Sequence, residues 1–451
     1  MAFVNPAQIN ISLATRSVNQ KGFGVPLFID ANFWGTERAK VFTSADAAKA
    51  ELPDGSPALT GVLAAFANEV KPERVILGRR QADSLLLVPD TVTTSGQTYE
   101  IVVEDTDGDT ITASFVTSTG TETASDIVTD ILADLGSATG VTTSGTTDIT
   151  LSKTGTDDFA ITSVKGFTYT ATATESASLA LTEVLKANRD AYFVASSDHS
   201  EAFILAMTDA TASEEMIYFW STQQENDLDA WNGTDAPTTI SEKVADKNAL
   251  RSVGMFDDEA DTKFPEMTYI GRFATKTPGT TTWTYKSLNG ISAARNPTTG
   301  NLLTDTELNN ICENKNLNVV VDLKGVDVVR DGKTTSGEWI DVVRSRDFLA
   351  ARLREAICNM LINKDKIPYT NSGISTVYGV IRTVLNRYVT TENQPNILSD
   401  DNPYELNVVR SEDISFADKA ERRLSISGTA FLAGAIQLVE LNLNLTYDAA
   451  A

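Results

Sequence analysis

Short runs of alternating apolar and polar residues stand near both ends of the chain, at residues 9–13 and 441–445. A period of two over such short runs is typical of half-buried β-strands. Chain ends usually fray unless something ties them down, so we expect each arm to pair with a sheet, in its own domain or in a neighbouring subunit. The apolar positions of the two runs are Ile9, Ile11, Leu13, Leu441, Leu443 and Leu445.

Residues 90–175 differ in pattern from their surroundings. Thr fills 25 of the 85 positions after residue 90, and two alternating runs flank an Asp/Gly-rich turn at 105–109, which is typical of a β-hairpin. Further on, Ile127, Ile131 and Leu135 recur every four residues and predict the apolar stripe of one helix. We interpret this segment as a small β-rich domain inserted into a parent domain.

The flanking segments 21–89 and 176–299 alternate helical and strand-like patterns. Ser44 is a candidate N-cap for a first helix, and apolar runs alternate with helical stretches on both sides of the insertion. This order predicts an outer α/β domain whose sheet is flanked by helices and interrupted once. The predicted strands include 74–77, 192–195 and 216–220, and the predicted helices include 58–70, 181–188 and 200–210.

Residues 300–434 predict an α+β domain, followed by a C-terminal arm at 435–451. Two long helices, one beginning at Ser345 and one following Gly373, each stack apolar residues on one face, which favours a core role over a cofactor site. The predicted strands here are 317–323, 326–329 and 424–426. With residues 1–20 as an N-terminal arm, the whole chain is predicted to be an α+β / α/β multi-domain protein.

The net charge of the chain argues against two classes of binding partner. The 37 Lys and Arg residues stand against 61 Asp and Glu residues, and the net charge of −24 repels nucleic acid and anionic membranes. No apolar run is long enough to span a bilayer, and the N-terminal residues lack the order of a signal peptide, so we expect neither membrane insertion nor export. Cys312 and Cys358 both lie in predicted helices and are expected to be buried free thiols.

Few residues suggest chemistry. His199 is the sole histidine and lies in a polar turn before a helix, where a surface or helix-start position is expected. The segment 331–334 has part of a phosphate-loop pattern, but Asp327 stands where the first glycine is needed, so a turn is favoured. The 105–109 turn resembles a calcium loop without its final acid, and 257–259 is expected to be a solvated acidic loop. We therefore predict no enzyme, no metal and no cofactor.

The order of several motifs resembles a known family, the contractile tail sheath proteins of tailed bacteriophages (myovirus-type). The resemblance covers most of the chain except the insertion. The motifs are Gly-Phe-Gly-Val-Pro at 22–26, Gly-Arg-Phe at 271–273, Trp283, Gly-Ile at 290–291, Asn-Pro at 296–297 and Gly-Glu-Trp-Ile-Asp at 337–341.

The resemblance implies a structural subunit that assembles in the host cytoplasm into the virion tail. Its partners would be copies of itself, in hexameric rings of a helical stack, together with the tail tube, baseplate and tail terminator proteins. Contraction of the stack would drive the tube through the host envelope. The arms would add strands to neighbouring subunits. An alternative is a virion surface protein whose Thr-rich insertion attaches to a host receptor or glycan.

The resemblance also places the C-terminal domain against the tail tube. Residues 341–390 carry 8 basic and 4 acidic side chains, so they could meet an acidic tube surface. The alternatives are solvated faces, or internal pairing with Asp341, Asp347 and Glu355. The tube-facing candidates are Arg344, Arg346, Arg352, Arg354, Lys364 and Lys366.

Overall fold

The computed structural model describes residues 21–155, 158–392, 394 and 396–437. It divides the chain into two compact units. The large unit comprises residues 22–277 and 281–343, and the C-terminal unit comprises residues 278–280 and those from 344 onward, together with Lys21. The predicted arm residues Ile9, Ile11, Leu13, Leu441, Leu443 and Leu445 lie outside the described residues.

An eight-stranded sheet in the order β15-β14-β13-β12-β11-β1-β3-β2 forms the centre of the large unit. The six inner strands run parallel, whereas β2 and β15 pair antiparallel with their neighbours at the two edges. The strands are β1 Pro26–Asn32, β2 Ala39–Phe42, β3 Val75–Gln81, β11 Phe193–Ser196, β12 Ile217–Thr222, β13 Ser252–Phe256, β14 Asn318–Asp322 and β15 Asp327–Arg330.

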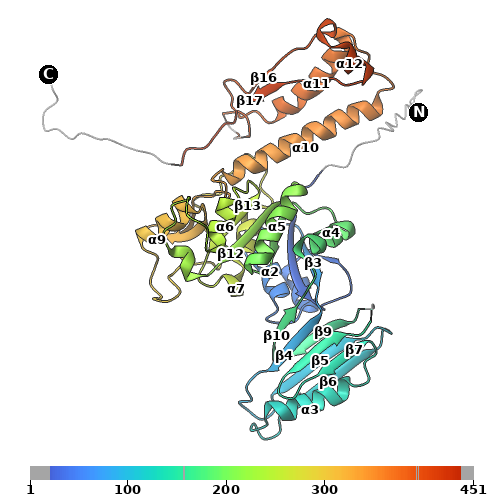
Figure 1. Ribbon diagram of the computed structural model, residues 1–451, viewed down its shortest axis with the longest axis vertical. Helices are drawn as coiled ribbons and strands as arrows, with labels where there is room; N and C mark the ends of the chain where they lie inside the picture. The colour runs from blue at the N-terminus through green and yellow to red at the C-terminus, as the bar shows by residue number, and fades with distance from the viewer. Residues whose placement is uncertain (1–20, 156–157, 393, 395, 438–451) are drawn as a thin grey trace, which may run out of the picture. The chain divides into compact units, whose positions relative to one another are not determined.

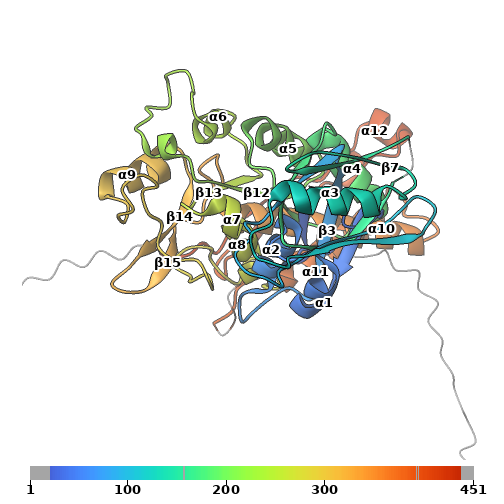
Figure 2. The ribbon, with the colours of Figure 1, turned by 90° about the horizontal axis from the view of Figure 1, so that it is seen from below.

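Helices cover both faces of this sheet, with α4, α5 and α6 on one face and α2, α7 and α8 on the other (Figure 2). Alternate strand residues serve the two faces, as in β1, where Leu27 joins the core under α4 and α5 and Phe28 packs against Phe264. The helices are α1 Ala45–Glu51, α2 Pro57–Phe66, α4 Ala177–Ala187, α5 Glu201–Ser213, α6 Ile240–Asp246, α7 Ala260–Lys263, α8 Pro265–Phe273 and α9 Asp305–Asn309.

Helix α2 packs directly against the ring of Phe28 through a glycine, Gly61. A Cβ atom built on Gly61 would stand 2.4 Å from the ring of Phe28, a distance that real side chains do not tolerate. The helix begins at Pro57, one residue before the predicted start, and ends at Phe66, four residues before the predicted end. Ser56 accepts a hydrogen bond from the Leu59 amide at its N-terminus. Ser44, the predicted N-cap of α1, likewise accepts from the Ala47 amide.

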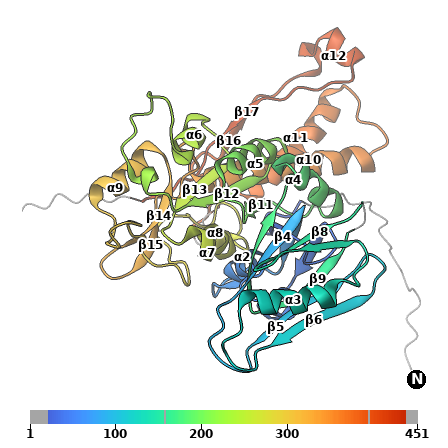
Figure 3. The ribbon, with the colours of Figure 1, turned by 60° about the horizontal axis from the view of Figure 1, so that its bottom comes forward.

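The inserted segment departs from β3 and returns to α4. It holds one four-stranded sheet, β10-β4-β8-β7, and one three-stranded sheet, β6-β5-β9, with helix α3 packed against β6 (Figure 3). The predicted stripe of α3, Ile127, Ile131 and Leu135, is fully buried. The elements are β4 Ser84–Pro89, β5 Thr98–Glu104, β6 Thr110–Val116, α3 Ala124–Leu135, β7 Val141–Ser144, β8 Ile149–Lys153, β9 Ala160–Lys165 and β10 Phe167–Thr172.

The C-terminal unit is built on two helices (Figure 1, orange to red). Helix α10, Ile340–Asn363, starts five residues before the predicted Ser345, because the chain turns at Gly337, whose φ is +81°, and enters the helix directly. Helix α11, Asn371–Arg387, buries Ile374, Tyr378, Ile381 and Leu385, as its apolar stripe predicts. Strands β16 Tyr404–Leu406 and β17 Gly428–Ala430 and helix α12 Phe416–Ala420 complete the described elements of this unit.

The strand predicted at 424–426 is wrong. Leu424 and Ile426 keep an alternating, partly buried pattern, but the backbone has no strand partner there, and β17 forms two residues later against β16. The alternating pattern therefore correctly predicts a segment buried on one side, but this segment has no paired strand.

Candidate functional site

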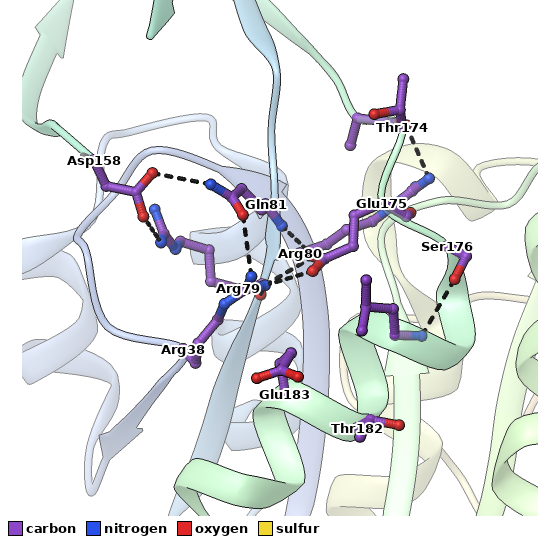
Figure 4. A network of polar contacts seen from close by, with 12 residues as sticks. Arg38, Arg79, Arg80, Gln81, Asp158, Thr174, Glu175, Ser176, Thr182 and Glu183 are labelled. Carbon is purple, nitrogen blue, oxygen red and sulfur yellow. Dashed lines mark hydrogen bonds and ion pairs between the residues drawn. The ribbon is translucent and has the colours of Figure 1, made fainter. Parts of the chain in front are cut away.

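A network of polar contacts joins the inserted domain to the parent sheet (Figure 4). At the end of β3, the buried Arg79 donates through Nη2 to Asp158 Oδ2 of the insertion at 2.6 Å and to the Thr36 carbonyl at 2.9 Å. Gln81 donates to the other oxygen of Asp158 at 3.0 Å. A charge on the parent sheet is thus neutralised by a carboxylate that the insertion supplies.

The returning chain of the insertion is held by two further arginines (Figure 4). Arg38 Nη1 donates to both carboxylate oxygens of Glu175, at 2.9 and 2.8 Å, and the Gln81 amide donates to the same carboxylate at 2.6 Å. Arg80 donates to the carbonyls of Glu175 and Ala173 at 2.7 and 3.0 Å. Such charge-assisted bonds set both the position and the direction of this segment.

Aromatic contacts add an apolar part to the junction. Phe33 stacks on Phe159 with centroids 4.5 Å apart, and Trp34 meets Tyr169 edge-on at 5.2 Å. The Ile161 amide donates to the Phe33 carbonyl at 2.7 Å, so the main chains of the two domains are also bonded. The insertion is therefore fixed to the parent sheet by charge, rings and backbone together.

His199 lies in a second polar cluster directly before α5, so the expected helix-start position is confirmed and the surface position is wrong. Its side chain is only 8 % exposed, with Nδ1 at 2.7 Å from Asp261 and Nε2 at 3.1 Å from Glu266, which is fully buried. Ser221 donates to the second oxygen of Glu266 at 2.6 Å. No local pattern around His199 indicates this cluster, because the two carboxylates lie 62 and 67 residues further along the chain.

The charge state of this cluster follows from its geometry. Burial alone lowers the pKa of His199, but the charge of Glu266 and the hydrogen bond to Asp261 outweigh it and raise the pKa from 6.5 to about 10. The same hydrogen bond lowers the pKa of Asp261. His199 is therefore an imidazolium at neutral pH, held between two carboxylates, and has no free nitrogen to act as a base.

A cavity of about 840 Å³ adjoins this cluster at the carboxyl ends of β1, β11 and β12. The strand order reverses between β1 and β11, and doubly wound sheets often bind ligands at such a point. Here, however, several of the polar groups that line the cavity are hydrogen-bonded to one another. Asp30 accepts from Ser197 and Asn32, and Gln223 donates to Asp261 at 2.9 Å. These side chains form a hydrogen-bond network that stabilises the ends of the strands.

The acidic loop at 257–259 is only partly solvated as predicted. Asp257 is 4 % exposed, and burial raises its pKa to about 6, whereas Glu259 is an exposed partner of Lys263. Asp257 follows β13 directly, so the end of a buried strand carries its carboxylate into the interior.

The two loop motifs are turns whose own side chains use the available amides. In the 105–109 turn the Asp105 carboxylate accepts from the amides of Asp107, Asp109 and Thr139, and the Thr139 bond is the main cause that lowers its pKa. At 331–334, the amides of Gly332 and Lys333 donate to the Asn318 side chain, at 2.8 and 3.0 Å. These amides are therefore not directed at a phosphate.

The two cysteines differ. Cys312 is a buried free thiol as predicted, but Cys358 is exposed on α10. The described part of the chain holds no group of three or more His, Cys, Asp or Glu side chains that could bind a metal ion. Among the described helices, none is both long and apolar enough to cross a bilayer.

The basic residues of α10 and the segment after it lie in different environments. Arg344 is buried. Arg352 pairs with Glu355 at 2.6 Å, and the half-exposed Arg346 lies 3.4 Å from Asp347, so two of the internal partners considered above are used. The candidates with exposed side chains are Arg354, Lys364 and Lys366.

An apolar groove of about 540 Å³ runs through the C-terminal unit between α10, α11 and the β16–β17 pair. Leu353, Ile357 and Val377 line it from the helices, and Leu406 and Ile426 line it from the other side. At its rim, Leu361 is 58 % exposed. The two strands beside it are three residues each, too short to be a stable sheet on their own.

We predict that the Arg79–Asp158 pair contributes strongly to stability. Asp158→Asn leaves a buried guanidinium without its counter-charge and should lower the free energy of unfolding by about 3 kcal/mol in urea titrations. Glu100→Gln is the matched control, since Glu100 pairs with a Lys165 that is 60 % exposed, and its loss should cost less than about 1 kcal/mol. Equal effects of the two variants would contradict the prediction.

We also predict a pH dependence from His199. Because its folded pKa is raised above the unfolded value of 6.5, its stabilisation is complete below pH 6.5 and is lost as the pH rises towards about 10. The difference in unfolding free energy between the wild type and His199→Gln should therefore be largest near pH 6 and shrink by pH 10. A difference that stays constant over this range would show that the charge plays no part.

Among the comparisons with known proteins, the matches are to solved structures. Neither a protein-family model nor a curated protein sequence matches the chain. Among solved structures, a chain of the anti-feeding prophage helical sheath in the contracted state aligns over 99 % of this chain and 100 % of its own, with 11 % identity and a TM-score of 0.53. A chain of the contracted anti-feeding prophage baseplate aligns over the same shares with 10 % identity and a TM-score of 0.55.

A third structure, the contracted sheath complex of the extracellular contractile injection system PVC, contains a chain that aligns over 99 % of both chains, with 9 % identity and a TM-score of 0.50. At such low identity these likenesses concern the fold, and they extend over nearly the whole length of each chain. They confirm at the level of the fold the resemblance that the sequence motifs predicted: this chain has the fold found in the sheath assemblies of contractile injection systems.

Proposed function

We propose that this protein is the structural subunit of a contractile tail sheath. The observation that carries the proposal is the correspondence of fold over 99 % of the chain with a helical sheath in its contracted state. In this role, copies of the chain stack as hexameric rings around a tail tube, between a baseplate and a terminator protein. Contraction of the stack drives the tube through the host envelope.

The proposed role assigns a task to each segment. The boundary expected at residue 300 falls near residue 343, because β14 and β15 pair into the large sheet. Residues 21–89 and 176–343 would therefore form the outer domain, 344–434 the inner domain towards the tube, and 90–175 an insertion on the outside. The subunits assemble in the host cytoplasm and remain in the tail of the particle. The work is mechanical, so no catalytic residue or cofactor is assigned.

We propose that the β16–β17 pair accepts an arm from a neighbouring subunit. A two-stranded sheet of three-residue strands leaves edge groups that a third strand can pair with, and the adjoining groove is apolar. Each arm offers apolar side chains at alternate positions, which suits a groove on one side of a sheet. Such main-chain pairing would keep subunits connected while their bodies rotate during contraction.

Electron microscopy of the purified chain tests the main proposal. Striated tubes or polysheath-like cylinders would support it. Discrete monomers or trimers that never polymerise and that attach to host glycans would contradict it and would favour the alternative, a surface protein that binds through its Thr-rich insertion.

Deleting residues 1–13, or residues 438–451, should abolish tube formation without unfolding the subunit, because only strands donated to neighbours are lost. Circular dichroism and thermal unfolding should match the full-length chain while tubes disappear from micrographs. As a control, Asn10→Thr with Ser12→Thr keeps the alternating pattern and should still polymerise. If either truncated protein still forms long tubes, the strand-exchange model is contradicted.

Reversing the exposed charges Lys364 and Lys366 to Glu should weaken co-assembly with tail tubes, most at low ionic strength, where surface charges are least screened. Tube-free polymerisation should persist. The control Lys49→Glu with Lys71→Glu changes the same number of exposed charges in the large unit and should leave co-sedimentation with tubes unchanged. If both pairs behave alike at every salt concentration, these lysines are solvated residues without a tube contact.

A further inference from the structure

The C-terminal unit has a second groove, of about 820 Å³, between α10 and α11. Its lining residues on α10 recur with helical spacing from Arg352 to Lys364, so the groove follows one face of this helix for about 18 Å. The lining combines apolar side chains with amides and hydroxyls, which suits an extended peptide whose main-chain groups need hydrogen-bond partners. Among these residues are Met360, Val380, Val384, Asn359, Thr376 and Thr383.

The main chain of Lys21 is fixed to two residues that line this groove. The Lys21 N–H donates to Glu355 Oε1 at 2.7 Å, and the Lys21 carbonyl accepts from Arg352 Nη2 at 3.2 Å. Arg352 and Glu355 also pair with each other at 2.6 Å, so this point of attachment is itself held in place. Twenty residues precede Lys21 in the sequence, and they therefore start from the Arg352 end of the groove.

Gly379 provides an independent observation at the same groove. It lies in the middle of α11 and lines the groove, although glycine destabilises the interior of a helix relative to alanine. A Cβ atom built on Gly379 would meet no described atom within 4 Å outside its own stretch of helix. The described contacts therefore do not require a glycine there, whereas a further segment lying close against the helix backbone would require one.

We propose that residues 15–20 of the same chain occupy this groove as an extended segment. An extended chain rises about 3.3 Å per residue, so a groove of about 18 Å holds five to six residues. Their sequence is Thr-Arg-Ser-Val-Asn-Gln, in which Val18 is the apolar residue and packs against the apolar part of the lining. The docking occurs within one chain, so it goes beyond the proposed sheath function and does not depend on it.

Charge alone would favour a different occupant. Beside the paired Arg352 and Glu355, the charged residues of the lining are Lys364 and Arg387, which match an acidic peptide better than a segment that carries Arg16. Attachment at Lys21 outweighs this difference, because a short connection gives the segment an effective concentration of about millimolar. Arg16 falls at the open Lys364 end, where solvent screens the two charges.

Docking of residues 15–20 determines where the rest of the arm begins. The arm then leaves the C-terminal unit at the Lys364 end of the groove, about 18 Å from Lys21. The strand predicted at residues 9–13 starts two residues before the docked segment. It is therefore presented from a fixed point of the subunit.

Disulfide formation in the full-length chain, kept dilute and unpolymerised, tests the docking. A Cys358→Ser background removes the exposed native thiol, and Val380→Cys places one cysteine in the groove. A disulfide needs Cβ atoms about 3.5–4.5 Å apart, so under mild oxidation at least one pair should cross-link within a single chain. It should do so at least tenfold faster than the same arm cysteine paired with Arg382→Cys, at an exposed position of α11 outside the lining. The arm cysteine is supplied in turn by Ser17→Cys, Val18→Cys or Asn19→Cys.

Gly379→Phe is the blocking variant, because its ring fills the groove without meeting a described atom at its Cβ. It should slow the cross-link at least tenfold. Arg382→Phe adds the same ring to α11 outside the lining and should leave the rate unchanged. Thermal unfolding monitors the fold of both variants, and the comparison of cysteine pairs decides the matter if Gly379→Phe fails to fold.

Three results would overturn the proposal. The first is that no arm cysteine reacts faster with Val380→Cys than with Arg382→Cys. The second is that the disulfides join two chains, which peptide mapping and the mass of the product reveal and which would assign the groove to the arm of a second copy. The third is that a poly-glutamate peptide at micromolar concentration prevents the cross-link, which would assign the groove to an acidic partner. Cross-linking and tube formation are measured separately, so either can fail without the other.

Discussion

Buried charge at the carboxyl edge of the parallel sheet must be neutralised, and much of the large unit is arranged around that requirement. Arg79 leaves β3 into the interior and can be accommodated only because the insertion brings Asp158 to it. On the other side of β1, His199 is charged because Glu266 is buried beside it. The insertion therefore completes the parent sheet at this edge, although its sequence interrupts the parent domain.

This requirement gives the insertion a larger role than its composition suggests. Thr-rich, acidic segments on a surface are commonly dispensable, and a deletion at a surface connection usually leaves the parent core intact. In this protein, however, the carboxylates of Asp158 and Glu175 neutralise arginines of the parent domain, and Phe159 stacks on a parent ring. The parent sheet and the insertion therefore form one structural unit.

Local patterns predicted the elements well, and partners distant in sequence could not be predicted. The stripe of α3, the stripe of α11 and the hairpin around 105–109 follow from spacing alone, because each is formed by neighbours along the chain. The burial of His199 and Asp257 depends on where other strands and helices come to lie, which no local pattern encodes. The same reason explains the missing strand at 424–426, since a strand needs a partner as well as an alternating sequence.

The large sheet ends at both sides in an antiparallel strand of only four residues, β2 and β15. Each of these carries charged side chains, Lys40 on β2 and Asp327 and Arg330 on β15. Short charged edges discourage two sheets from joining side by side, which is a common route to uncontrolled aggregation. A protein that is proposed to polymerise through donated strands has a particular need for this protection. Pairing between the large sheets of neighbouring copies would compete with the intended strand exchange.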